Sequence, residues 1–244
     1  TNMHAQWGGA WVVILIMAVS FQTIPMFHVA PSFPLYLRKY LPISLLGLVV
    51  ILSWKQNLSQ LVGGTILLSL CMYMACILFL LNKRKRKIPD TTIYYWQLSA
   101  LSLFVVFALY VIPDHLLFEN VAKKKTMLLT AIFIFFYVLS IIQGLLLKIL
   151  PFLSYTHLQQ RCLTNFGAMH LIPNMHEFLK KKHGQWLLVS HICAGIFLIV
   201  TILYPTLYWV FGSLLLIEFL GLLYLMLRTI NQYKKSLRKI NLLD

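Results

Sequence analysis

The sequence predicts an all-α protein, a polytopic transmembrane bundle of about seven spanning helices. Of the 244 residues, 60% are apolar and only 11% are charged, whereas soluble domains carry roughly 25% charged residues. The few charges also gather in clusters that separate long apolar runs. A single hydrophobic core could not bury this much apolar surface, but a bilayer can surround it. We therefore expect one transmembrane domain that covers residues 1–244.

Three apolar runs in the first third of the chain are expected to span the membrane, for which a helix needs about 20 mostly apolar residues, and the second of them is short. We expect these spans at about residues 7–27, 40–54 and 59–81. A group of prolines that begins at Pro25 closes the first run. Pro42 lies in the first turn of the second run, where proline is tolerated. The third run stops at a basic segment.

Four further runs follow, and prolines mark their ends. Pro113 closes the fourth run, Pro151 follows the fifth, and Pro205 makes the turn between the last two. A polar segment between the fifth and sixth runs, residues 154–184, is the longest stretch that is not expected to span the membrane. The four spans are expected at about residues 93–112, 127–150, 185–204 and 207–227.

The basic residues divide unequally between the two ends of these runs. When seven spans alternate, seventeen of the 21 Lys and Arg residues fall on one face of the membrane. Cytoplasmic loops carry an excess of Lys and Arg. The sequence therefore predicts that the N-terminus lies outside and the C-terminus lies in the cytoplasm. The four residues on the other face are Lys55, Lys123, Lys124 and Lys125.

The net charge of +15 is also found in proteins that bind nucleic acid. We expect no nucleic acid here, because basic residues beside spanning helices fix topology and touch anionic lipid headgroups. Aromatic residues near the ends of the runs, among them Trp54 and residues 94–96, are expected to be interfacial anchors. The four cysteines are expected to be small buried hydrophobes; they are Cys71, Cys76, Cys162 and Cys193.

Two ionisable residues stand inside the expected spans, His191 and Glu218. Such residues are costly in a bilayer and are functional candidates by default. At about 1.5 Å of rise per residue they lie about 22 and about 18 Å from the turn at Thr206, which is nearly the same depth. Gly195 and Gly221 lie on the same helix faces, and small residues mark close helix approach. We expect the two side chains to interact, directly or through water, either as a functional pair or only to hold two helices together.

Other polar residues fall into three groups. Gln22 and Gln143 lie inside spans and are expected to form hydrogen bonds between helices. His4 begins the first run beside two glycines, which would let a flat cofactor approach the backbone closely, so it is a candidate cofactor ligand. Three histidines of the polar segment are expected to be solvated loop residues: His170, His176 and His183.

Motifs of soluble catalysis are missing from the sequence. It contains no Gly-rich phosphate loop, no Gly-x-Ser-x-Gly and no His-Glu-x-x-His. Six acidic residues leave few sites for paired-carboxylate catalysis. No internal repeat stands out, which weakens the interpretation as a transporter built from repeats. The sequence therefore predicts no catalytic residue.

Two stretches carry a resemblance to a known family. The first is Ile-Met-Ala-Val-Ser-Phe-Gln at residues 16–22, followed by Pro25-Met26-Phe27, and the second is Lys-Ile-Leu-Pro-Phe-Leu-Ser-Tyr-Thr-His-Leu at residues 148–158. Together they resemble a group of bacterial inner-membrane proteins that are similar to haem-copper oxidase subunit I and to nitric-oxide-response haem-copper membrane proteins. The likeness covers most of the chain as the later part of a longer protein. The start at Thr1, without a basic leader region, fits that expectation.

The resemblance implies a membrane protein that binds haem b or copper, in respiration or the nitric oxide response, together with other membrane subunits or a redox partner. His4 and His157 would be ligands because each lies in or beside a matching stretch, and His28 is a weaker candidate. His191 and Glu218 would supply internal polarity or a proton step. The adjacent histidines and the His-Pro-Glu-Val-Tyr stretch that mark the copper centre of the oxidases are missing. The chain is therefore not expected to be a complete oxygen-reducing subunit.

Two other functions remain open. One is a proton-coupled transporter or channel that uses the intramembrane pair His191 and Glu218. The other is a non-catalytic accessory subunit of a larger membrane complex. A bound cofactor would separate the first interpretation from these two, and a pH-dependent flux lost in Glu218→Gln would favour the transporter or channel.

Overall fold

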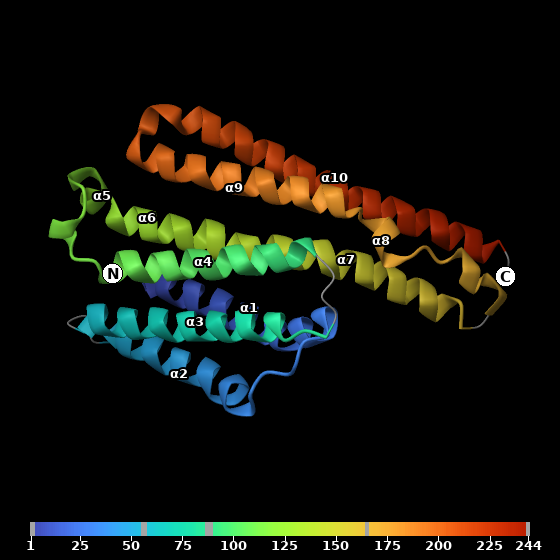
Figure 1. The fold of residues 1–244 in the computed structure, drawn as a ribbon, viewed down its shortest axis with the longest axis horizontal. Coiled ribbons are helices and arrows are strands. Elements are labelled where there is room, and N and C mark those ends of the chain that lie inside the picture. The colour runs from blue at the N-terminus through green and yellow to red at the C-terminus, as the bar shows by residue number, and fades with distance from the viewer. Residues whose placement is uncertain (1–2, 55–57, 86–89, 164–165, 243–244) are drawn as a thin grey trace. The chain divides into compact units, whose positions relative to one another are not determined.

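A computed structural model describes residues 3–54, 58–85, 90–163 and 166–242 (Figure 1). Within these ranges every regular element is a helix, and seven helical segments are long and apolar enough to cross a membrane. The predicted fold class and number of spans are confirmed. The long helices are α1 (Met3–His28), α2 (Leu35–Trp54), α3 (Ser59–Asn82), α4 (Thr91–Val111), the continuous α6 (Lys125–Ile132), η3 (Phe133–Leu139) and α7 (Ser140–Arg161), α9 (Lys181–Leu203) and α10 (Tyr208–Asn241).

Short helices connect these spans. They are η2 (Asp114–Leu116), α5 (Glu119–Lys123), η4 (Phe166–Leu171), α8 (Met175–Phe178) and η5 (Pro205–Leu207). One long element is not uniform, because η3 is a π-helical segment that joins α6 to α7 without a break. A π-helical turn inside a longer helix carries an extra residue per turn and is often found near functional sites.

Helix ends are where the sequence interpretation was least accurate. Pro25 and Pro151 lie inside α1 and α7 and do not end them. Neighbouring helices can compensate the backbone group that a proline leaves unpaired, so a membrane helix tolerates it. The seventh span was expected to end near residue 227, but α10 continues to Asn241. Its last turns are amphipathic and bury Ser236 and Ile240, which gives that polar sequence a reason to stay helical.

The chain divides into two compact units. Unit 1 comprises residues 1–89 and 96–141, and its core joins α1, α2 and α3. Inside it Ser20 and Tyr73 are hydrogen-bonded, and the Tyr73 ring packs among Phe21 and Phe33. After α1 the chain turns at Val29, which has a φ of 50°. This left-handed conformation ends the helix.

Unit 2 comprises residues 90–95 and 142–244 and contains the antiparallel hairpin of α9 and α10, the orange and red helices of Figure 1. Two buried clusters organise it. One joins Tyr95, Leu147, Leu187 and Leu225, and the other lies further along α7 and α10. The second cluster consists of Leu158, Cys162, Phe178 and Ile240.

Exposed aromatic side chains mark both ends of the α9–α10 hairpin. Tyr204, Tyr208 and Trp209 are exposed at the turn, and Trp186 and Tyr224 are exposed at the other end. From Trp186 to Tyr204 is about 27 Å at 1.5 Å per residue, close to the roughly 30 Å of a bilayer's hydrocarbon core. Amphipathic aromatic rings prefer the membrane–water boundary. These two belts therefore indicate how the hairpin sits in a bilayer.

All four cysteines lie within the described residues, and none forms a disulfide. Cys71 and Cys162 are buried, as predicted, and Cys76 is partly buried. The prediction is wrong for Cys193, which is exposed on α9. In a membrane protein an apolar side chain on the outside of a helix can contact lipid, so hydropathy alone does not place it in the core.

Candidate functional site

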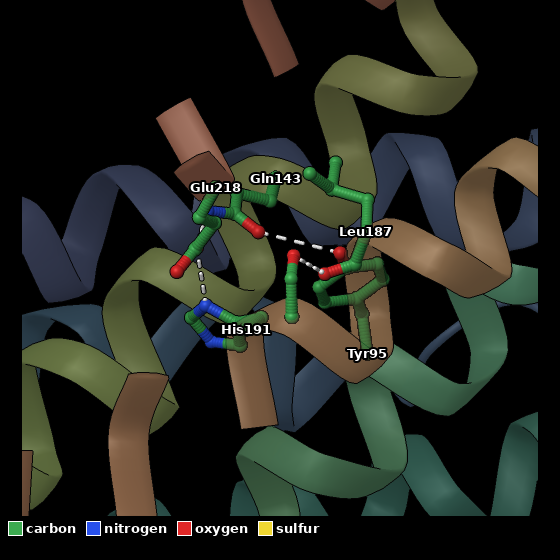
Figure 2. A network of polar contacts seen from close by, with 6 residues as sticks. Tyr95, Gln143, Leu187, His191 and Glu218 are labelled. Carbon is green, nitrogen blue, oxygen red and sulfur yellow. Dashed lines mark hydrogen bonds and ion pairs between the residues drawn. The ribbon is translucent and has the colours of Figure 1, made fainter. Parts of the chain in front are cut away.

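Four buried polar side chains meet inside unit 2. They come from four different helices: Tyr95 from α4, Gln143 from α7, His191 from α9 and Glu218 from α10 (Figure 2). His191 and Glu218 are fully buried, with 0% of each residue exposed. Tyr95 and Gln143 are also buried. We call these four residues the polar cluster.

The depth of the polar cluster follows from the aromatic belts. At 1.5 Å per residue, His191 is about 8 Å along α9 from Trp186 and about 20 Å from Tyr204. Glu218 is about 9 Å along α10 from Tyr224. Both residues therefore lie within the apolar slab, that is, the hydrocarbon core of the bilayer, and not at its boundary with water. An ionised group at this depth costs several kcal/mol unless it is paired and hydrogen-bonded.

Close helix contact lets Tyr95 reach the cluster. Gly144 follows Gln143 on α7, and a Cβ atom built at Gly144 would lie 2.8 Å from the Tyr95 Cβ. Only glycine leaves room for this approach of α4 to α7. At Gly221 the same construction gives an ordinary contact of 3.6 Å to Leu187. The neighbouring helix therefore does not approach α10 at Gly221 as closely as α4 approaches α7 at Gly144.

Glu218 is the centre of the hydrogen bonds. His191 Nδ1 lies 2.7 Å from Glu218 Oε1, and the Gln143 amide donates to the same oxygen. The Tyr95 hydroxyl donates to Gln143 Oε1 over 3.3 Å. The other carboxyl oxygen, Glu218 Oε2, is buried and has no hydrogen-bond partner among the residues that the structure describes. The predicted contact between His191 and Glu218 is confirmed, and Gln143 bonds between helices as expected.

The place of an acidic proton on Glu218 depends on which group donates in the bond to His191. When Oε1 accepts from both Gln143 and His191, a proton on Glu218 sits on Oε2. The carboxyl group can then be ionised or neutral without breaking either bond to Oε1. The imidazole of His191 provides a second protonation site in direct contact. The polar cluster therefore places a carboxyl group and an imidazole, both of which can carry a proton, in direct contact.

A layer of apolar side chains separates the polar cluster from charged groups further along the same helices. Leu147, Leu187 and Leu225 form this layer, packed against Tyr95. Beyond it Lys148 forms an ion pair with Asp90. At the same end Arg228 Nη1 lies 3.3 Å from His183 Nε2. The polar cluster is thus shielded from the basic end of unit 2.

The histidines implied by the resemblance lie elsewhere. His157 is exposed on α7, and its Nδ1 lies 2.8 Å from the Tyr233 hydroxyl. His28 is buried at the last residue of α1. The side chain of His4 lies outside the described part of the structure. His4 and His28 stand at opposite ends of α1, about 36 Å apart along the axis, so they could not bind one metal ion together.

Two other polar residues were placed wrongly. His183, expected in a solvated loop, is partly buried in the first turn of α9, because α9 starts earlier than hydropathy indicated. Gln22, expected to bond between helices, is exposed on α1 and makes no hydrogen bond within the described residues. His170 is exposed, as expected, with Nδ1 2.7 Å from the Gly167 carbonyl oxygen. The side chain of His176 is not described.

Sequence reasoning missed Tyr95. Residues 94–96 were interpreted together as interfacial anchors, yet only Tyr94 is exposed, while Tyr95 and Trp96 are buried. Three consecutive residues on a helix point about 100° apart, so they cannot all face lipid. A residue-by-residue helical projection of α4 could have separated them. The ion pair of Lys148 with Asp90 was also missed, because its partners are far apart in sequence.

No family model, curated protein or solved structure matches this chain. Within the described residues, no group of three or more His, Cys, Asp or Glu side chains could hold a metal ion. The chain is a multi-pass membrane protein in contact with lipid. Any more specific function has to be argued from the polar cluster itself.

Proposed function

We propose that the chain is a proton-coupled transporter or a proton channel, in which His191 and Glu218 bind and release a proton within the bilayer. The observation that carries this proposal is the fully buried carboxyl group of Glu218. One of its oxygens is hydrogen-bonded to both Gln143 and His191, and the other has no partner among the described residues. An intramembrane carboxyl group next to a histidine is typical of proton relays.

A purely structural role explains the arrangement less well. A contact that only holds helices together is most stable when all its buried polar atoms are satisfied. Here Oε2 is left over, although Gln143 and Tyr95 add two further polar groups to the same cluster. The leftover oxygen is the position where an acidic proton would be held. We therefore assign the proton to Oε2, with Gln143 and Tyr95 as positioning residues.

The first experiment measures proton flux. The purified chain is reconstituted into liposomes that contain a pH-sensitive dye, and a potassium diffusion potential drives proton entry. We expect flux above that of empty liposomes, and we expect Glu218→Gln to abolish it. Glu177→Gln is the matched control, because Glu177 is an exposed carboxylate on α8. Equal flux in the wild type and Glu218→Gln would overturn the role of Glu218.

A transporter that moves protons only with its substrate would show no flux in that assay. Infrared difference spectroscopy then tests protonation directly. As the bulk pH is stepped from acid to alkaline, the carbonyl band of a protonated buried carboxyl group should disappear. This band should be missing in Glu218→Gln at every pH and unchanged in Glu177→Gln. A band that does not respond to pH would contradict proton exchange at Glu218.

The proposal includes an orientation. We propose that the N-terminal end lies outside and the C-terminal end in the cytoplasm of a bacterial inner membrane. The uneven distribution of Lys and Arg supports it. An impermeant thiol reagent applied to intact cells tests it, with a single cysteine placed at position 118 or 238 in a cysteine-free background. Reagent should reach Phe118→Cys and not Arg238→Cys, and the reverse pattern would invert the topology.

Haem or copper binding, implied by the resemblance, is the second candidate. One observation favours His157 as a ligand: the Tyr233 hydroxyl holds its Nδ1. Ligating histidines usually have their other ring nitrogen hydrogen-bonded in this way, so Nε2 would be the metal ligand. A single histidine can hold haem iron, which would supply redox chemistry that the side chains lack.

An optical spectrum of the purified chain, oxidised and then reduced, tests this second candidate together with metal analysis. A Soret band that His157→Ala removes would support it. His4→Ala and His28→Ala would then be compared in the same way, because either could also carry the cofactor. A featureless spectrum without stoichiometric copper would overturn the haem or copper candidate.

A further inference from the structure

We infer that unit 2 contains a binding site for the phosphate of an anionic phospholipid, formed by Arg228 on α10 and held in place by His183 on α9. The inference goes beyond the proton function and does not depend on it. It rests on the contact between these two residues, on the charges around them and on their position relative to the aromatic belt.

In the contact between Arg228 and His183, the hydrogen-bond donor and acceptor can be assigned. Arg228 Nη1 lies 3.3 Å from His183 Nε2, and a guanidinium group can only donate. His183 Nε2 therefore accepts, and its ring is neutral with the proton on Nδ1. This contact uses one of the five N–H groups of Arg228 and neutralises none of its charge. The imidazole fixes the orientation of the guanidinium and leaves its charge available to a ligand.

Among the described residues, no carboxylate of the protein forms an ion pair that would neutralise the charge of Arg228. Unit 2 has three described carboxylates, and each has another partner. Asp90 pairs with Lys148, Glu177 accepts from Asn174, and Glu218 is hydrogen-bonded to His191 and Gln143. Lys180, Lys181 and Lys182 precede His183 and add positive charge to the same end of the hairpin. A partly buried guanidinium in such a field attracts an anion.

The position of the two residues identifies the anion's source. His183 lies about 5 Å along α9 beyond Trp186, and Arg228 about 6 Å along α10 beyond Tyr224. Trp186 and Tyr224 are the exposed rings of the aromatic belt at this end of the hairpin. Such rings sit at headgroup level, so Arg228 lies where lipid phosphates lie. Its planar fork can bind two phosphate oxygens at once.

Lipid binding to the full-length chain tests the inference. The protein is purified in a neutral detergent, and retention of phosphatidylglycerol is measured by native mass spectrometry as the lipid is titrated. Phosphatidylcholine and inorganic phosphate are titrated in parallel. We expect one tightly retained phosphatidylglycerol in the wild type, about tenfold weaker retention in Arg228→Gln, and an intermediate loss in Arg228→Lys, which keeps the charge but lacks the fork.

Arg238→Gln is the matched control, because it removes the same charge from an exposed position on the same helix. It should retain phosphatidylglycerol as the wild type does. Equal weakening in Arg228→Gln and Arg238→Gln would mean diffuse attraction and would overturn the inference. Competition by inorganic phosphate at the lipid's own concentration would also overturn it, because the site would then bind a soluble anion.

His183→Leu gives a second, independent test of the positioning role. It keeps every charge and removes the acceptor that orients Arg228. Retention of phosphatidylglycerol should weaken, and Arg228→Lys should no longer weaken it further in the His183→Leu background. If the two substitutions weaken retention independently, His183 does not act through Arg228. Should Arg228→Gln fail to fold, this pair of variants still decides the inference.

Discussion

Replacing Gly144 by alanine should separate α4 from α7 and weaken the polar cluster. The new Cβ atom would lie 2.8 Å from the Tyr95 Cβ, whereas carbon atoms in good contact are about 3.5–4.0 Å apart. The contacted atom is next to the backbone of α4, so no rotation of the Tyr95 side chain relieves it. The two helices must therefore move apart by about 1 Å.

Three effects determine how much Gly144→Ala changes the free energy of unfolding. Overpacking of a tight interface costs about 1–3 kcal/mol. The bond from Tyr95 to Gln143 is already 3.3 Å long, and a further 1 Å would break it at a cost of about 1 kcal/mol. Alanine in place of glycine in a helix gains about 1 kcal/mol. The last two effects cancel, so we expect a net loss of about 1–3 kcal/mol.

Reversible unfolding in mixed detergent micelles, titrated with sodium dodecyl sulphate, measures this free energy. Gly47→Ala is the control, because Gly47 is exposed on α2 and a Cβ atom there would have no neighbour within 4 Å. It should be neutral or stabilising by up to about 1 kcal/mol. If Gly144→Ala were as stable as Gly47→Ala, the close contact between α4 and α7 would be refuted.

Three further substitutions can be measured in the same unfolding assay. Glu218→Leu should destabilise the protein by about 3–5 kcal/mol because it removes the hydrogen-bond partner that two buried polar side chains share, and a loss below that of Gly144→Ala would argue against a central role for the carboxyl group. Val29→Gly should stabilise it by about 1 kcal/mol, because glycine adopts a positive φ without the strain of a β-branched residue; no change would mean that Val29 is unstrained. Lys148→Met should cost about 1–3 kcal/mol by removing the ion-pair partner of a partly buried carboxylate, whereas Lys123→Met, in a largely exposed ion pair, should change stability little. Equal effects of the two lysine substitutions would contradict the burial of the Lys148 pair.

Hydropathy was enough to predict the spans, because the apolar residues that a spanning helix needs are consecutive in the sequence. It also identified His191 and Glu218, since an ionisable group stands out against an apolar run. Their contact followed from equal depth on two helices of one hairpin. Helix ends were harder to predict, because Pro151 and the basic residues after 227 resemble breakers and loops in sequence.

Contacts between helices that are far apart in the chain could not be predicted from the sequence pattern. Tyr95 reaches Gln143 from a helix 48 residues earlier in the chain, and no local spacing encodes that pairing. The bond of Arg228 to His183 is of the same kind. In one case a local signal did exist: Leu225, Thr229, Ser236 and Ile240 are buried at intervals of four and seven residues. This periodicity could have predicted that α10 continues as an amphipathic helix.

The length of α10 has a mechanical consequence. It is a single helix of 34 residues, and Asn241 lies about 35 Å from Glu218 along its axis. A stiff rod converts a small rotation at one point into a larger displacement at its end. A tilt of about 10° at Glu218 would move the far end by about 6 Å, well above the roughly 1–2 Å of a helix shift at an interface. Ile240 near that end packs against Leu158 and Phe178. Any change in the angle of α10 that accompanies protonation at Glu218 would therefore produce a larger displacement at the far end of the helix. That displacement would rearrange the cluster formed by Leu158, Cys162, Phe178 and Ile240.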